Sequence, residues 1–191
     1  MTALVVALLA ASPGASWTLS VETDPVFWVG TVPNGPAVDL NVDVTLAAVP
    51  GLRVGVLGWS GRWSGDFGRA AVLPSAFSEP EWAVRWSGLG VEAQYQFRLG
   101  LERGGLGPGV RLQWSRFAFD RGAVEVVADH FVVTPQVGFQ WFPFRALGLY
   151  LLPWAGVQLP VAGTGTVMTT EGARDTRRIL LVVTAHVGWA F

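Results

Sequence analysis

Alternation of apolar and polar side chains is the feature of this sequence that most constrains its fold. In residues 179–191, alternate positions are apolar through to Phe191, and Thr184, His186 and Gly188 occupy the positions between them. A β-strand sends successive side chains to opposite faces, so this segment is expected to form a strand with one apolar face. Seven further segments show the pattern, the first of them least regularly: 17–22, 38–46, 52–57, 89–99, 110–115, 130–141 and 147–158.

The composition indicates a membrane, but the apolar stretches do not suit transmembrane helices. Of the residues, 51% are hydrophobic and 14% are charged, against about 25% charged in an average soluble domain. Residues 146–170 are uncharged, but Pro153 and Pro160 would each remove a helical hydrogen bond. A closed barrel satisfies every backbone polar group in lipid with strands of about 9–11 residues. The sequence therefore predicts an all-β fold, an eight-stranded antiparallel up-and-down transmembrane β-barrel.

A soluble barrel with the same number of strands is the competing fold, and it would have an apolar interior and a polar exterior. The scarcity of charge favours lipid outside, because the charges gather in the connections and on one face of the strands. Tryptophans near strand ends suit the aromatic girdles of a membrane barrel. The expected girdle residues are Trp17, Trp28, Trp59, Trp82, Trp114, Trp141 and Trp189.

The connections are expected to alternate in length, as they do in outer-membrane barrels. Short turns are predicted at residues 48–51, 100–107 and 143–146, and long loops at 61–82, 119–129 and 159–178. At the N-terminus, an apolar run is followed by small residues up to Ser16, which is typical of a signal peptide. The predicted organisation is a signal peptide at 1–16 and a barrel at 17–191.

The C-terminal residues carry a resemblance to a known class. Phe191 is the last residue, and Ala185, Val187 and Trp189 share its face. This pattern resembles the C-terminal assembly signal of bacterial outer-membrane β-barrels, and the chain is similar in size and strand number to the small OmpA, OmpX and OmpW type. The resemblance implies assembly by the barrel-insertion machinery. It also implies residence as a monomer among the lipid and lipopolysaccharide of a Gram-negative outer membrane. Activities differ widely within this class, so function does not follow from the fold.

Charged and polar residues on inward-facing positions are the candidate functional residues. An eight-stranded barrel is just wide enough for side chains to fill, and buried charges must find partners. We therefore expect a lumen plugged by hydrogen-bonded ion pairs, with a narrow path along Asp39, Asp43 and Arg98 as the alternative. The expected lumen network consists of Glu22, Asp39, Asp43, Arg53, Glu92, Arg98, Arg111, Tyr150 and His186.

Several chemistries are excluded by residue types. The chain has no cysteine, which excludes disulfides, cysteine-ligated metals and a cysteine nucleophile. All its basic residues are arginine, which removes lysine Schiff-base chemistry. A net charge of −1 gives no electrostatic footprint for nucleic acid. His130 and His186 are expected to lie too far apart along the barrel to share a metal, so no metal or other cofactor is predicted.

A structural or surface-interaction role without enzymatic activity is the predicted function. A narrow, porin-like channel for small or hydrophobic solutes is one alternative, and a lipid A-modifying barrel enzyme is another. Such enzymes present a histidine with a nearby serine on the outer wall, whereas His130 and His186 both fall on inward-facing positions. The alternative that a serine from another loop acts together with His130 stays open.

Overall fold

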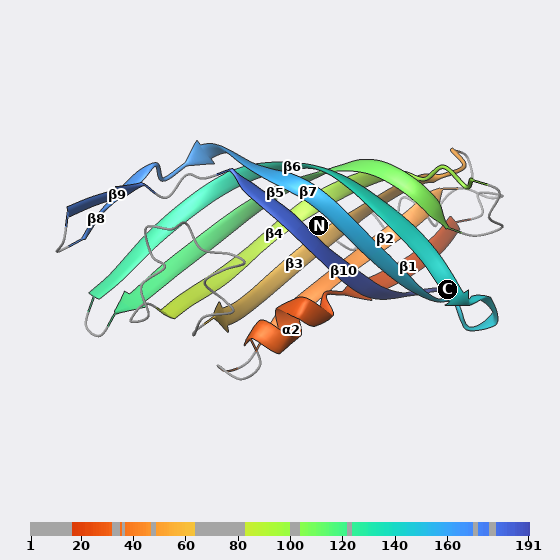
Figure 1. Ribbon diagram of the computed structural model, residues 1–191, viewed down its shortest axis with the longest axis horizontal. Helices are drawn as coiled ribbons and strands as arrows, with labels where there is room; N and C mark the ends of the chain where they lie inside the picture. Colours follow the sequence, from red (N-terminus) through yellow and green to blue (C-terminus); the bar gives the residue numbers. More distant parts are fainter. Residues whose placement is uncertain are drawn as a thin grey trace.

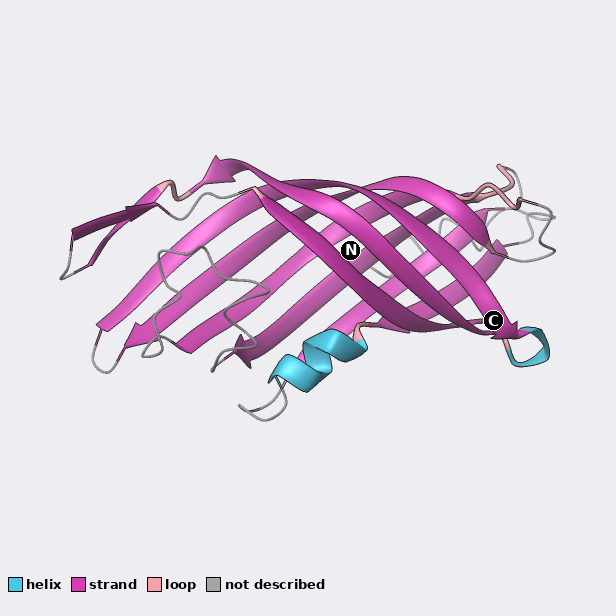
Figure 2. Ribbon diagram, viewed as in Figure 1, coloured by secondary structure: helices cyan, strands magenta, loops and turns pink. Residues whose placement is uncertain are grey.

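The protein is a closed antiparallel β-barrel in the computed structural model (Figure 1). Strands dominate the part of the chain that the structure describes (Figure 2). This part comprises residues 17–31, 35, 37–46, 49–63, 83–99, 104–121, 124–169, 172–175 and 179–191. The predicted signal peptide at 1–16 lies outside the described residues.

Neighbouring strands of the barrel follow one another along the chain, and the last pairs with the first. The order around the wall is β1-β10-β7-β6-β5-β4-β3-β2, so the predicted eight-stranded up-and-down topology is confirmed. The barrel strands are β1 (Trp17–Thr23), β2 (Val38–Leu46), β3 (Leu52–Trp63), β4 (Ala83–Tyr95), β5 (Gly105–Arg121), β6 (Val124–Phe144), β7 (Leu149–Gly163) and β10 (Leu180–Ala190). The other elements are α2 (Pro25–Thr31), η3 (Arg145–Leu147), β8 (Thr166–Thr169) and β9 (Gly172–Asp175).

Alternate side chains point outward and into the lumen, as the sequence pattern predicts. On β10, the outward-facing Leu181 and Val183 are 75% and 72% exposed, whereas His186 on the opposite face is buried. On β4, Leu89 and Val91 are exposed, and Glu92 is buried. The apolar face therefore covers the outside of the barrel, which is the reverse of a soluble barrel.

The apolar outer belt ends at a row of charged side chains. On β5, outward-facing residues are apolar over 106–114, close to the about 9–11 residues that a tilted membrane strand needs. The next outward-facing residue, Arg116, donates from Nε and Nη2 to Asp129 of β6 over 2.9 and 3.0 Å. Arg85 and Asp120 form a second exposed pair at 3.4 Å. We call the end of the barrel where these charges lie, and where β3, β5 and β7 end, the distal end.

All three predicted long loops are partly strand. Residues 119–129 lie mostly in β5 and β6, which pair as far as Arg121 and Val124. Their charges indicated a loop, but Phe119 and Val126 face the lumen and are buried, so the strands continue beyond the apolar belt. In the region 159–178, β7 extends to Gly163, and β8 and β9 form a small hairpin that projects beyond the barrel (Figure 1). Within 61–82, β3 extends to Trp63, and residues 64–82 lie outside the described part.

The first strand is short because a helix replaces its continuation. β1 ends at Thr23, and Asp24 caps α2 by accepting from the backbone N–H groups of Val26 and Phe27 at 2.8 and 3.2 Å. Pro25 occupies the first helical position, where its missing N–H costs nothing. The helix packs beside the distal part of the wall (Figure 1). Its Phe27 is buried and packs against Trp59 and Trp63. None of the helices in the described residues has the length and apolar character needed to cross a bilayer.

The tryptophans divide between the outer wall and the lumen. Four of the expected girdle residues are exposed, namely Trp17, Trp114, Trp141 and Trp189. The girdle prediction is wrong for Trp59, which is only 7% exposed because it shares the inward face of β3 with Arg53. Trp28 lies on α2 rather than at a strand end and donates from Nε1 to Thr23 at 2.5 Å. Trp82 lies outside the described residues.

Gly55 leaves space for an inward-facing carboxylate and gives a test of the register. It pairs with Asp43 across β2 and β3, and a Cβ at this position would collide with the Asp43 carboxylate. The change Gly55→Ala is expected to lower the free energy of unfolding by about 1–3 kcal/mol through overpacking. The measurement is urea unfolding of the refolded barrel in lipid vesicles. Gly58→Ala is the control on the same strand, because its Cβ would meet only the Gly88 carbonyl oxygen at 3.8 Å; an equal loss there would contradict this register.

Candidate functional site: an ion-pair cluster across the lumen

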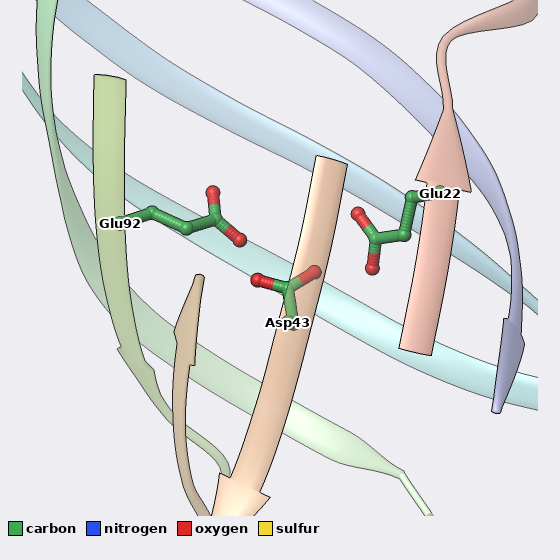
Figure 3. Close-up of side chains that lie close together, drawn as sticks. All are labelled: Glu22, Asp43 and Glu92. Carbon is green, nitrogen blue, oxygen red and sulfur yellow. The ribbon is translucent and has the colours of Figure 1, made fainter. Parts of the chain in front are cut away.

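A buried guanidinium group on β3 joins carboxylates from three other strands. Arg53 Nη2 forms ion pairs with Glu22 of β1, with Asp43 of β2 at 2.5 Å and with Glu92 of β4 at 3.4 Å. The Arg53 side chain is 1% exposed. Figure 3 shows the three carboxylates converging from their separate strands.

A second arginine completes the row of charges. Arg111 of β5 donates to Glu92 Oε2 from Nε at 3.0 Å and from Nη2 at 2.7 Å, so two N–H groups of the guanidinium converge on one carboxylate oxygen. The same guanidinium lies over the ring of Trp154, 4.5 Å from its centroid, where the electron-rich face of the ring attracts a cation. Arg111 therefore links β4 and β7 across the lumen.

Glu22 extends the cluster to the two strands that close the barrel. It accepts a hydrogen bond of 2.6 Å from the Tyr150 hydroxyl of β7, and its Oε2 lies 2.9 Å from His186 Nδ1 of β10. Trp154 Nε1 donates to His186 Nε2 at 3.0 Å. Because an indole N–H only donates, Nε2 must be the unprotonated nitrogen, and the proton on Nδ1 points at Glu22. His186 is thus a neutral bridge between an indole and a carboxylate.

The strand register brings these residues together although they are distant in sequence. Asp43 pairs with Gly55, Gly55 pairs with Glu92, and Glu92 pairs with Arg111. Neighbouring strands lie about 4.8 Å apart, so inward-facing residues on one such row approach closely inside a narrow barrel. Gly55 in the middle of the row carries no side chain, which leaves room for the Asp43 carboxylate.

The carboxylates could be ligands for a cation, but arginine already supplies the positive charge. Oxygens of Glu22, Asp43 and Glu92 lie within 4.8 Å of one another, a spacing that a metal ion can bridge. Arg53 Nη2 is in ion-pair contact with all three, so the guanidinium occupies the central position. The arrangement can hold strands together and block the lumen.

Two residues of the expected lumen network take no part in the ion-pair cluster, because Asp39 lines the lumen nearer the distal end and Arg98 lies outside it. Asp39 is near the distal end of β2, where its Oδ2 accepts from the backbone N–H of Asp24, and Thr23 Oγ1 donates to its carbonyl oxygen at 2.8 Å. Arg98 is exposed in the turn that follows β4. The prediction that Arg98 faces the lumen extended the alternation of apolar and polar residues beyond Tyr95. Because β4 ends at Tyr95, the Arg98 side chain lies outside the barrel interior.

A cluster of aromatic side chains lines the lumen at the distal end, and the sequence pattern alone did not reveal it. The ring centroids of Trp59 and Trp86 are 5.4 Å apart, those of Phe27 and Trp63 are 5.7 Å apart, and Trp86 stacks on Phe117 at 5.7 Å. Extending the inward-facing positions of β3 and β5 beyond their polar residues would have found this group, because Trp59, Trp63 and Phe117 continue them. The lumen therefore changes from charged to aromatic along its length.

A serine and a histidine also meet inside the barrel. Ser115 and His130 are direct partners across β5 and β6, and both are buried. His130 Nε2 donates to the Thr164 carbonyl oxygen at 2.9 Å. The Ser115 hydroxyl has no hydrogen-bond partner among the described residues, so it is not activated by the histidine. Pairing β5 with β6 in antiparallel register would have revealed this pair. That register depends on the position of the turn between the two strands, which the sequence analysis placed in a longer loop.

The expected C-terminal assembly residues lie on the outer face. Trp189 and Phe191 are exposed and their rings stack with centroids 6.4 Å apart. Ala185 and Val187, on the same face, are partly exposed. The backbone N–H of Phe191 donates to the Leu19 carbonyl oxygen at 2.8 Å, which ties the last residue to the first strand.

Comparisons with known proteins identify the fold. No family model matches the sequence, and no curated protein matches it. Among solved structures, the chain is similar to the crystal structure of Neisserial surface protein A, with a TM-score of 0.53 and 14% sequence identity. The match covers 93% of this chain and 99% of that one. The predicted resemblance to small eight-stranded outer-membrane barrels is thus confirmed at the level of the fold.

Removing the central guanidinium should destabilise the barrel far more than removing an exposed one. Arg53→Gln leaves three buried carboxylates without their shared cation, and we expect the free energy of unfolding to fall by about 3–5 kcal/mol. Urea unfolding in lipid vesicles, followed by tryptophan fluorescence, measures the change. Arg116→Gln is the matched control, since its ion pair with Asp129 is exposed to solvent and should contribute little. Equal effects of the two changes would contradict a central role for Arg53.

Proposed function

We propose that the protein is a closed, non-conducting outer-membrane barrel with a structural or surface-interaction role and no enzymatic activity. The observation that carries this proposal is the cluster around Arg53 and Arg111. Its ion pairs join inward-facing side chains of β1 to β5, and further contacts reach Trp154 of β7 and His186 of β10, so the cluster extends over most of the barrel wall. An eight-stranded barrel leaves little space beyond its own side chains. A solute would have to break several buried ion pairs in order to pass.

The outer surface supports a membrane location for this closed barrel. An apolar belt of about the length that a bilayer requires gives way to charged side chains at the distal end. The β5–β6 strands continue beyond these charges, and the β8–β9 hairpin projects beyond the barrel, so both are suited to contact partners outside the membrane. We place the protein as a monomer in a Gram-negative outer membrane, inserted by the barrel-assembly machinery through its C-terminal signal.

Conductance across a planar bilayer tests the closed lumen. The refolded barrel is expected to give no stable current, whereas Arg53→Ala combined with Arg111→Ala should leak, because the change removes both guanidinium groups from the lumen. Arg116→Ala, which removes a guanidinium group from the outer face, is the control and should stay closed. Heat-modifiable migration on a gel shows that each variant is folded. A steady current through the unmodified protein would contradict the proposal and support the narrow channel.

Both histidines are engaged in hydrogen bonds, which supports the absence of enzymatic activity. His130 and His186 are buried on the lumen side, and each is held by hydrogen bonds to neighbouring groups. A lipid A-modifying enzyme needs a histidine whose unprotonated nitrogen can take a proton from a nucleophile, and the unprotonated Nε2 of His186 is already held by the indole N–H of Trp154. We therefore expect that mass spectrometry will find the same number of acyl chains on lipid A from cells with and without the gene. A change that His130→Ala abolishes would contradict the proposal.

A further inference from the structure

A cavity lies inside the distal half of the barrel, between the ion-pair cluster and α2. Its volume is about 220 Å³. Arg111, Asn41 and His186 contribute polar groups to its lining, and Trp59, Trp63 and Trp86 contribute aromatic walls. The cavity is larger than the about 150 Å³ that holds a single benzene ring in an engineered protein core, so it has room for part of one small apolar molecule.

The cavity reaches the edge of β10 and does not stay inside the lumen. All five residues from 180 to 184 line it. Successive side chains of a strand point to opposite faces, and contact with five residues in a row fits a space that reaches the edge of β10, which no described strand covers at residues 180–184. This edge exists because β1 stops at Thr23, and its pairs with β10 begin only at Val187. Leu181 and Val183, on the outer face beside this edge, are exposed within the apolar belt.

The helix α2 forms the other side of this lateral opening. It stands where a longer β1 would have paired with β10, and Val26, which is 40% exposed, lines the cavity. Thr184 Oγ1 donates to Asp24 Oδ2 at 2.8 Å and fixes the start of the helix to β10. Within the described part of the chain, apolar side chains therefore lie at the margins of this opening on the outer face.

Hydrogen-bond donors in the cavity lining lack partners. The indole N–H groups of Trp59, Trp63 and Trp86 are buried and have no acceptor among the described residues. Trp59 is 7% and Trp63 is 3% exposed. A buried donor without a partner costs about 1–3 kcal/mol, so three such groups favour a molecule that brings acceptor oxygens.

The charges of the cavity oppose an anionic molecule. Two carboxylates, those of Asp24 and Asp39, are in the lining. The guanidinium of Arg111 is already bound to Glu92, and His186 accepts from Trp154, which makes it the neutral form. The oxygens that suit this lining are therefore those of a neutral group such as an ester, ether or hydroxyl.

We propose that this cavity binds a neutral single-chain amphiphile, a monoacylglycerol or a molecule of the same chemistry, which enters sideways from the membrane between α2 and β10. Its oxygens accept hydrogen bonds from the tryptophans, and its chain lies along Leu180 and Val182 towards the opening. The inference rests on the membrane location proposed above. It requires no passage through the lumen, because the ion-pair cluster lies across the lumen at the inner end of the cavity.

Photolabelling of the full barrel in phosphatidylcholine vesicles tests this site. The probe is a monoacylglycerol that carries a diazirine in its chain, and the comparison is the free fatty acid with the same chain. Peptide mass spectrometry is expected to find the neutral probe on the β3 and β10 residues of the cavity, with excess unlabelled monoacylglycerol preventing this labelling. The fatty acid should label only the outer wall, because its carboxylate is repelled.

Two variants separate a bound molecule from lipid that merely surrounds the barrel. Val182→Trp fills the cavity from the inward face of β10 and should reduce the competed labelling to background, whereas Ala155→Trp on the outer face of the neighbouring β7 should leave it unchanged. Trp59→Phe combined with Trp63→Phe keeps the aromatic walls but removes two N–H donors, and should weaken competition by the monoacylglycerol about ten-fold. Folding of each variant is verified by gel migration.

Each outcome decides between the inference and its alternatives. Uncompeted labelling spread over the outer wall, labelling that persists in Val182→Trp, or preference for the fatty acid would overturn the inference. A barrel that washes off the vesicles in alkaline carbonate would mean that the proposed membrane location fails. A barrel that stays in the membrane and shows no competed site would overturn the cavity ligand alone.

Discussion

The guanidinium of Arg53, buried among Glu22, Asp43 and Glu92, is the interaction on which the rest of the barrel depends. Removing charges from water is costly, and the cost is offset only when each charge finds close partners of opposite sign. Here the partners come from β1, β2 and β4, and Arg111 adds β5. A shift of one residue in any of these strands would turn a charge outward into the apolar belt, so the cluster and the register stabilise each other.

The cluster also divides the lumen into parts with different chemistry. At its level the interior is ionic and closed, and towards the distal end the inward-facing positions become aromatic. The same short β1 that supplies Glu22 to the cluster ends two residues before α2, and its early end leaves the edge of β10 open beside the cavity. The position of Glu22 in the cluster and the unpaired edge of β10 therefore have a common origin in the length of one strand.

Much of the fold could be predicted because lipid and lumen impose opposite demands on alternate residues. The inward positions of Glu22, Asp43, Arg53, Glu92 and Arg111 follow from parity alone. The prediction is wrong for Arg98 and for the girdle role of Trp59. Parity assigns a face only within a strand, and Arg98 lies past the end of β4. Trp59 does obey parity, but an aromatic residue near a strand end suits either a girdle or a lumen.

The sequence by itself determined the number of strands, the apolar face that points outward and the residues that the lumen must accommodate, because a period of two is a local property of the chain. Only the tertiary structure decided which charges pair, that Asp39 stays apart from the cluster, and that residues 119–129 continue two strands. These outcomes depend on the stagger of strands around a closed wall, which places residues distant in sequence on one row. The cavity likewise exists only because α2 takes the place of a strand beside β10.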